Sequence, residues 1–161
     1  TLFKGDLGKY SNMDSMIKKA QVTQQDLIRS EQYGVNNYNI GKFNSTADIV
    51  KKIPNAIIAG LYRPFLWEAN NVVMIVSGLE NSVILILTLY IFLWSGGILR
   101  STKKIFLDPL LIFIFLFSIF FAFSIGLSTA NFGALVRYRI PLLPFFTSGL
   151  MILFIKKINK T

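Results

Sequence analysis

The chain has no cysteine and no histidine among its 161 residues. Thiolate nucleophiles, disulfides, zinc sites built from Cys and His, and acid–base catalysis by His are therefore excluded. Acidic residues are also few: there are eight, against 17 Lys and Arg, and only Glu80 and Asp108 follow Val72. The remaining carboxylates lack the spacing of a calcium loop, so the sequence predicts neither a metal site nor a cofactor.

Apolar residues are abundant instead, at 53% of the chain with 15 Phe against two Trp. They form three long runs, Val72–Trp94, Leu107–Ser128 and Ile140–Ile155. A hydrocarbon core about 30 Å thick needs about 20 largely apolar residues in a helix, and the first two runs meet this requirement. The third is short, and Pro141 and Pro144 restrict its start, which predicts a broken or tilted helix. The predicted fold is an all-α polytopic membrane protein with about three transmembrane helices.

Two shorter regions precede the predicted membrane region at 71–161. Residues 1–48 are polar, with a predicted helix from Met13 to Gln32 followed by a Gly- and Asn-rich loop, and are predicted to form a soluble region. Residues 49–70 carry isoleucines at helical spacing around Pro54, which is predicted to split the helix. This segment is predicted to lie along the membrane surface as an amphipathic interfacial segment. An ordinary soluble helix packed on the N-terminal region is the alternative.

Basic residues at the ends of the apolar runs predict the orientation. Cytoplasmic loops of membrane proteins are enriched in Lys and Arg, so the basic clusters after the first and third runs are expected to be cytoplasmic. Three spans then place residues 1–70 on the other side, the periplasm of a bacterial cell with this protein in its inner membrane. Membrane lipids are the expected partners and nucleic acid is not. The basic residues are Arg100, Lys103 and Lys104, then Lys156, Lys157 and Lys160.

The chain begins at Thr1 without a methionine and shows no signal peptide. Further transmembrane helices upstream, or other membrane subunits, are therefore expected partners.

Glu80 is the only acidic residue within the first apolar run. It lies nine residues past Asn71, about 13 Å along a helix, where an ionised carboxylate is costly and needs a partner. Its role is open between a general base or proton carrier and a structural ion pair that locks helix packing. Arg137, Arg139 or an upstream span is expected to supply the partner.

Arg137 and Arg139 lie between the second and third runs, on the predicted outer side. Cations on that side oppose the usual charge bias and therefore need another explanation. Guanidinium groups bind phosphate or pyrophosphate by two parallel hydrogen bonds, as a lipid-linked sugar donor would require. The alternative is contact with lipid headgroups or a salt bridge to Glu68 or Glu80.

A third cluster, Arg63-Pro-Phe-Leu-Trp-Glu68, combines a cation, a proline, two aromatic rings and a carboxylate. Arg63 and Glu68 are five residues apart and form no favoured helical pair unless Pro64 bends the chain. The rings could stack on a sugar while Glu68 acts as an acid or base. The alternative is an interfacial anchor.

Two stretches, Tyr62 to Glu80 and Asn131 to Phe145, resemble the C-terminal part of bacterial inner-membrane proteins of surface-polysaccharide assembly. The second also resembles the Arg-Tyr-x-x-Pro end of membrane glycosyltransferases that use polyprenyl-phosphate sugars. This resemblance implies transfer or polymerisation of lipid-linked saccharides. Arg137, Arg139, Arg63 and Asn131 would bind substrate, and Glu80 or Glu68 would assist the acceptor hydroxyl. A transporter, a flippase, a secretion-complex subunit and a purely structural subunit are the alternatives.

Overall fold

A computed structural model describes residues 13–28, 37, 38, 40, 41 and 46–158. This part of the chain is built from helices, which confirms the all-α prediction. The predicted end of the first helix at Gln32 lies outside the described residues. In chain order the helices are α1 (Met13–Ile28), α3 (Thr46–Tyr62), the 3₁₀ turn η2 (Leu66–Glu68), α4 (Val72–Trp94), α5 (Ile98–Phe106), α6 (Pro109–Ser128), α7 (Phe132–Tyr138) and α8 (Leu142–Ile158).

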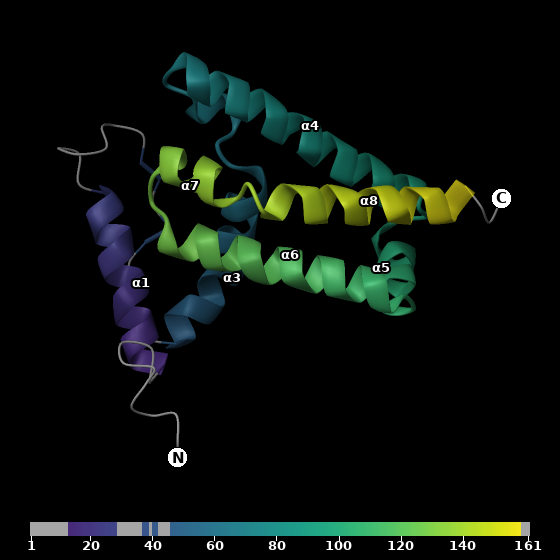
Figure 1. The fold of residues 1–161 in the computed structure, drawn as a ribbon, viewed down its shortest axis with the longest axis horizontal. Coiled ribbons are helices and arrows are strands. Elements are labelled where there is room, and N and C mark those ends of the chain that lie inside the picture. The colour runs from purple at the N-terminus through teal and green to yellow at the C-terminus, as the bar shows by residue number, and fades with distance from the viewer. Residues whose placement is uncertain (1–12, 29–36, 39, 42–45, 159–161) are drawn as a thin grey trace.

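Three long helices, α4, α8 and α6, lie alongside one another, with α8 between the other two (Figure 1). Among the described residues, α4 and α6 are each long and apolar enough to cross a membrane. The helices α7 and α8 meet at a bend of 62° and form a third candidate span if they are counted together. The two or three candidate spans are consistent with the prediction of about three, and the bend between α7 and α8 lies where a break was predicted.

Side-chain caps set where these helices begin. The Asn71 side chain accepts a hydrogen bond from the Met74 amide at 2.9 Å, at the start of α4. Asp108 caps α6, which has Pro109 in its first turn, where a missing N–H group costs nothing. Asn131 caps α7 in the same way. Local sequence therefore fixes each of these three starts.

The outer surfaces of α4 and α6 are apolar. Exposed side chains recur along both helices, and in water so large an apolar surface would drive association. In a bilayer the same surface contacts acyl chains, so these helices are compatible with a membrane-embedded protein. More than half of the side-chain surface is exposed at Val76, Val83, Ile86 and Leu93 of α4 and at Phe113, Leu116 and Phe120 of α6.

Small residues bring α3 directly against α6. A Cβ atom added to Gly60 would overlap the backbone of Ala122, and one added to Gly126 would overlap the backbone of Ala56. The two helices therefore run antiparallel with their backbones in contact, as in small-xxx-small packing of membrane helices. The predicted break at Pro54 is wrong, because α3 continues through it. Ile49 before the proline and Ala56 after it pack in the same cluster with Ile17 and Leu127, so tertiary contacts hold the helix on both sides of the hydrogen bond that the proline removes.

The last turn of α3 lies beside α4 and α8. The Tyr62 hydroxyl is hydrogen-bonded to Thr88 of α4, and its ring lies edge-on to Phe146 of α8 with centroids 6.3 Å apart. The chain then turns, and the backbone of Leu66 in η2 lies against Gly78 of α4. Residues 46–71 thus form a hairpin that packs against the candidate spans, and the position of 49–70 at a membrane surface stays a prediction.

The helix α1 takes a different course and runs across the end of the bundle where α6 finishes (Figure 1). Its Ile17 packs with Ala56 of α3 and Leu127 of α6. The basic helix α5 and the C-terminal end of α8 lie at the opposite end of the bundle (Figure 1). The two ends therefore differ in composition as well as in position.

Candidate functional site

The turn between α3 and η2 carries an ion pair between Arg63 and Glu68. The Arg63 Nε lies 3.0 Å and 3.1 Å from the two carboxylate oxygens of Glu68, and its Nη2 also pairs with that carboxylate. The Phe65 amide donates to the same carboxylate at 3.0 Å. The five-residue spacing allows this pair because the chain turns at Pro64 and does not continue as a helix.

Two stacked rings lie against the guanidinium group of Arg63. Its Cζ is 5.0 Å from the ring centroid of Tyr38 and 5.6 Å from that of Phe132. The rings stack on each other with centroids 5.0 Å apart. A cation within about 6 Å of an aromatic face is attracted by the ring, and Arg stacks on such faces more readily than Lys. Arg63 is therefore held in place by the rings as well as by Glu68.

Tyr38 is itself fixed to the end of α6. Its hydroxyl is hydrogen-bonded to Thr129 at 2.8 Å and to the Gly126 carbonyl at 3.3 Å, and its amide donates to the Ala130 carbonyl at 2.9 Å. Burial raises the pKa of Tyr38 to about 12. The hydroxyl therefore keeps its proton at physiological pH and acts as a hydrogen-bonding anchor and not as a base.

Two side chains from the candidate spans hold the backbone of this turn. Nη1 of Arg139 donates to the Arg63 carbonyl at 3.1 Å, and the Asn81 side-chain amide donates to the Pro64 carbonyl at 2.9 Å. Carbonyls at a helix end lack partners within the helix, and they need donors when water is excluded. Arg139 and Asn81 therefore connect α7–α8 and α4 to the tip of the hairpin.

Arg139 also faces Glu80, with Nη2 and Oε2 3.9 Å apart. The Arg139 side chain is completely buried, whereas that of Glu80 is 55% exposed. The prediction that Glu80 has a cationic partner is confirmed, and Arg139 is that partner. Within the described part of the chain, Nε and Nη2 of Arg139 make no hydrogen bond. Buried N–H groups without hydrogen-bond partners are costly. Arg139 therefore either lowers the stability of the fold or donates these N–H groups to an acceptor on a bound ligand.

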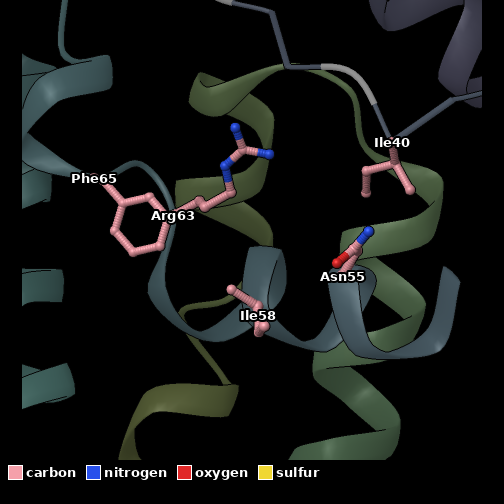
Figure 2. Close-up of a pocket in the computed structure, with 5 residues that line it drawn as sticks. All are labelled: Ile40, Asn55, Ile58, Arg63 and Phe65. Carbon is pink, nitrogen blue, oxygen red and sulfur yellow. The ribbon is translucent and has the colours of Figure 1, made fainter.

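Arg63 forms part of the wall of a pocket of about 290 Å³. Figure 2 shows Arg63 and Phe65 on one side and Ile40 and Asn55 on the other, with Ile58 between them on α3. The lining thus offers a guanidinium group, an amide and apolar surface. Small-molecule sites have this combination of mostly apolar walls with a few fixed polar groups, at a volume near the small end of their range.

The Glu68 carboxylate is the better defined of the two candidate acid–base groups. Burial alone raises its pKa, but hydrogen bonds from Arg63 and from the Phe65 amide outweigh burial, and the net pKa is lowered. Glu68 is therefore ionised at neutral pH and a weak base. It is suited to orienting Arg63, whereas Glu80 is the more accessible carboxylate.

The remaining predicted site residues, Arg137 and Asn131, belong to α7 and its N-terminal cap. Arg137 is exposed on α7, and its Nε donates to the Gly133 carbonyl at 3.3 Å. Asn131 caps α7, and its amide donates to the Asn37 side chain at 3.1 Å. The structure therefore brings Arg63, Glu68, Glu80 and Arg139 together and separates Arg137 from them. No group of three or more carboxylates suited to a metal ion occurs among the described residues.

Sequence reasoning did not identify Tyr38 or Asn55 as parts of this site. Tyr38 is an isolated aromatic residue in a segment rich in Asn and Gly. Such a sequence does not predict that the tyrosine side chain is buried. Asn55 belongs to α3, whose position depends on the small residues Ala56 and Gly60. A search for small residues four apart would have found that helix contact.

Comparisons with known proteins found no match: no family model, no curated protein and no solved structure matches this chain. The function is therefore argued from the geometry of the site.

Proposed function

We propose that this chain belongs to a bacterial inner-membrane protein that transfers or polymerises lipid-linked saccharides. The observation that carries the proposal is the position of Arg63 in the wall of a pocket that also offers the Asn55 amide and apolar side chains. A polyprenyl-linked saccharide presents a phosphate group beside sugar hydroxyls and a hydrocarbon chain. These groups match a guanidinium, an amide and apolar walls respectively.

Each residue of the cluster has a distinct role in this proposal. Arg63 binds the phosphate through Nη1, because Glu68 accepts from its Nε and Nη2. Glu68 is a positioning residue that fixes the guanidinium plane. Arg139 is a second positioning residue, since it holds the Arg63 carbonyl. Glu80 assists the acceptor hydroxyl as a general base. Arg137 has no part, which replaces the earlier expectation that it binds pyrophosphate together with Arg139.

The proposed orientation places α1 and α7 in the periplasm. The distribution of charge supports it, because the basic residues of α5 and Lys156 of α8 lie at one end of the bundle (Figure 1). That end is expected to be cytoplasmic. Cysteine introduced at Arg100 or at Gln25 tests this, since the chain has no native cysteine. Labelling of the Arg100 site in intact cells, with the Gln25 site protected, would reverse the orientation.

Conservative arginine substitutions test the function. We expect Arg63→Lys to lower surface-polysaccharide production at least about tenfold, because Lys retains the charge but its single ammonium group cannot pair with Glu68 through two nitrogens and present a third to the phosphate. Arg137→Lys is the matched control and should leave production unchanged. The measurement is polysaccharide per cell in a deletion strain complemented with each full-length variant, with the protein level in membranes determined in parallel.

Normal polysaccharide with Arg63→Lys, or in the deletion strain, would contradict the proposal. An equal loss with Arg137→Lys would show that the effect is not specific to the pocket, because Arg137 does not line it. Both outcomes are interpretable only if the variants accumulate to the same level.

A transporter or flippase is the second candidate, and the Glu80–Arg139 ion pair favours it. Charged pairs among transmembrane helices often couple ion or substrate movement to a change in helix packing. In that case Glu80→Gln would leave lipid-linked saccharide unflipped on the cytoplasmic leaflet. A transferase or polymerase with the same substitution would instead accumulate the lipid-linked saccharide on the periplasmic leaflet.

A further inference from the structure

A second and larger cavity, of about 660 Å³, lies where α1 crosses α6. We call it the α1–α6 groove. Its apolar lining includes Met16 and Ile17 of α1 and Phe120, Phe123 and Leu127 of α6. Its volume falls within the range of ligand-binding sites, and it is separate from the pocket that contains Arg63.

The groove opens onto the apolar surface of α6. Phe120 lines the groove and is 67% exposed, and it continues the stripe of Phe113 and Leu116 at three- and four-residue spacing. This stripe faces acyl chains if α6 spans a bilayer. A hydrocarbon chain can therefore enter the groove sideways without leaving an apolar environment.

The hydroxyl groups in the lining already donate within their own helices. The Ser124 hydroxyl donates to the Phe120 carbonyl at 2.8 Å, the Ser128 hydroxyl to the Ser124 carbonyl at 2.7 Å, and the Thr23 hydroxyl to the Lys19 carbonyl at 2.9 Å. An extended peptide would need hydrogen-bond partners for its backbone, and these groups have no proton left to donate to it. The lining therefore suits an apolar occupant that needs no hydrogen-bond partners.

Lys19 is the charged side chain in the lining, and it is exposed on α1 at the end of the bundle. A cation beside an apolar groove at a membrane surface complements an anionic headgroup whose chain lies in that groove. We propose that the α1–α6 groove binds one acyl chain of an anionic phospholipid of the surrounding leaflet, with the headgroup phosphate at Lys19. This inference does not depend on the proposed saccharide chemistry.

Spin-labelled lipids test the headgroup. The full chain is reconstituted in vesicles, and the motionally restricted fraction is measured by electron paramagnetic resonance for phosphatidylglycerol and for phosphatidylcholine with the same chains. We expect phosphatidylglycerol to be preferred about fivefold, as one lysine at a membrane surface provides. Lys19→Gln should abolish the preference. Lys18→Gln, the adjacent lysine that does not line the groove, should retain it.

Filling the groove tests the chain site. Ser124→Phe should lower the restricted fraction by one lipid per protein for both lipids, because the new ring occupies the groove while the rest of the apolar surface still contacts acyl chains. Ser148→Phe, at an exposed position of α8 away from the groove, is the matched control and should leave the restricted fraction unchanged. Equal binding of the two lipids by the unmodified protein would overturn the proposal, as would equal losses with the two lysine variants or with the two phenylalanine variants. Displacement of phosphatidylglycerol by an equimolar polyprenyl phosphate would overturn the assignment to a bilayer phospholipid.

Discussion

The helices α3 and α4 follow one another in the chain but meet their surroundings in opposite ways. α4 is a long apolar helix with many exposed side chains, among them Val83 and Leu93. α3 is shorter, begins with charged residues such as Lys51, and has Ala56 and Ala59 completely buried. Hydropathy therefore detects the candidate span with an exposed apolar surface and overlooks the helix that packs closely on another helix.

The physical reason is the kind of contact that each helix makes. A lipid-facing surface must be apolar because acyl chains offer no hydrogen bonds. A helix that packs closely on another helix needs small residues, and its average hydropathy matters less. Polar groups at the end of such a helix are then held by other parts of the chain: Glu68 of η2 pairs with the Arg63 side chain, and Arg139 donates to the Arg63 carbonyl.

Methyl groups added in the α3–α6 contact should have the largest effect on the free energy of unfolding, and they test whether close backbone packing distinguishes α3 from α4. Gly60→Ala and Gly126→Ala should each lower the free energy of unfolding by about 3 kcal/mol, because the new Cβ overlaps backbone atoms of the facing helix. Gly78→Ala is the matched control, since its Cβ would lie 3.3 Å from the backbone of Leu66. There the gain in helix propensity, about 1 kcal/mol, offsets the close contact.

Thermal and denaturant unfolding in detergent measures these effects. An equal cost for all three alanine variants would show that the backbone contact between α3 and α6 does not distinguish the two helices.

The next largest effect is expected where α4 holds the turn. Asn81→Ala should cost about 2 kcal/mol, because it leaves the buried Pro64 carbonyl without its donor. Ser82→Ala is the control: its hydroxyl donates to the Gly78 carbonyl of the same helix, so its loss should be nearly neutral. The same unfolding assay separates the two. A neutral Asn81→Ala would mean that α4 and the hairpin tip are not coupled.

The smallest expected effect is the pH dependence of stability, which tests how much the Arg63–Glu68 ion pair stabilises the turn. The pKa of Glu68 is lowered in the folded state, so the unfolded chain binds the proton more strongly. The ion pair with Arg63 therefore stabilises the protein above the ordinary carboxyl pKa of 4.5, and this stability is lost as the pH falls below it. We expect the loss to be about 1 kcal/mol between pH 6 and pH 3. Melting temperatures measured over that range should show less dependence on pH for Glu68→Gln than for the unmodified protein.

Individual residue pairs of the candidate site could be predicted from the sequence. The carboxylate in the first apolar run predicted a cationic partner for Glu80, and the structure supplies Arg139. The proline between Arg63 and Glu68 indicated a turn that lets the two side chains pair. What the sequence could not show is that Arg137 and Arg139, only two residues apart, point into different environments. That difference depends on where α7 ends and α8 begins.

The sequence by itself determined the helical class, the candidate spans and the caps that start them. These features depend on local composition: apolar runs of sufficient length, and Asn or Asp before a helix. Tertiary structure alone decided that α3 packs against α6, that Tyr38 reaches Arg63, and that Arg139 and Asn81 meet one turn of the chain. These contacts join residues far apart in sequence, and they form because small residues allow two backbones to touch and because buried carbonyls require donors.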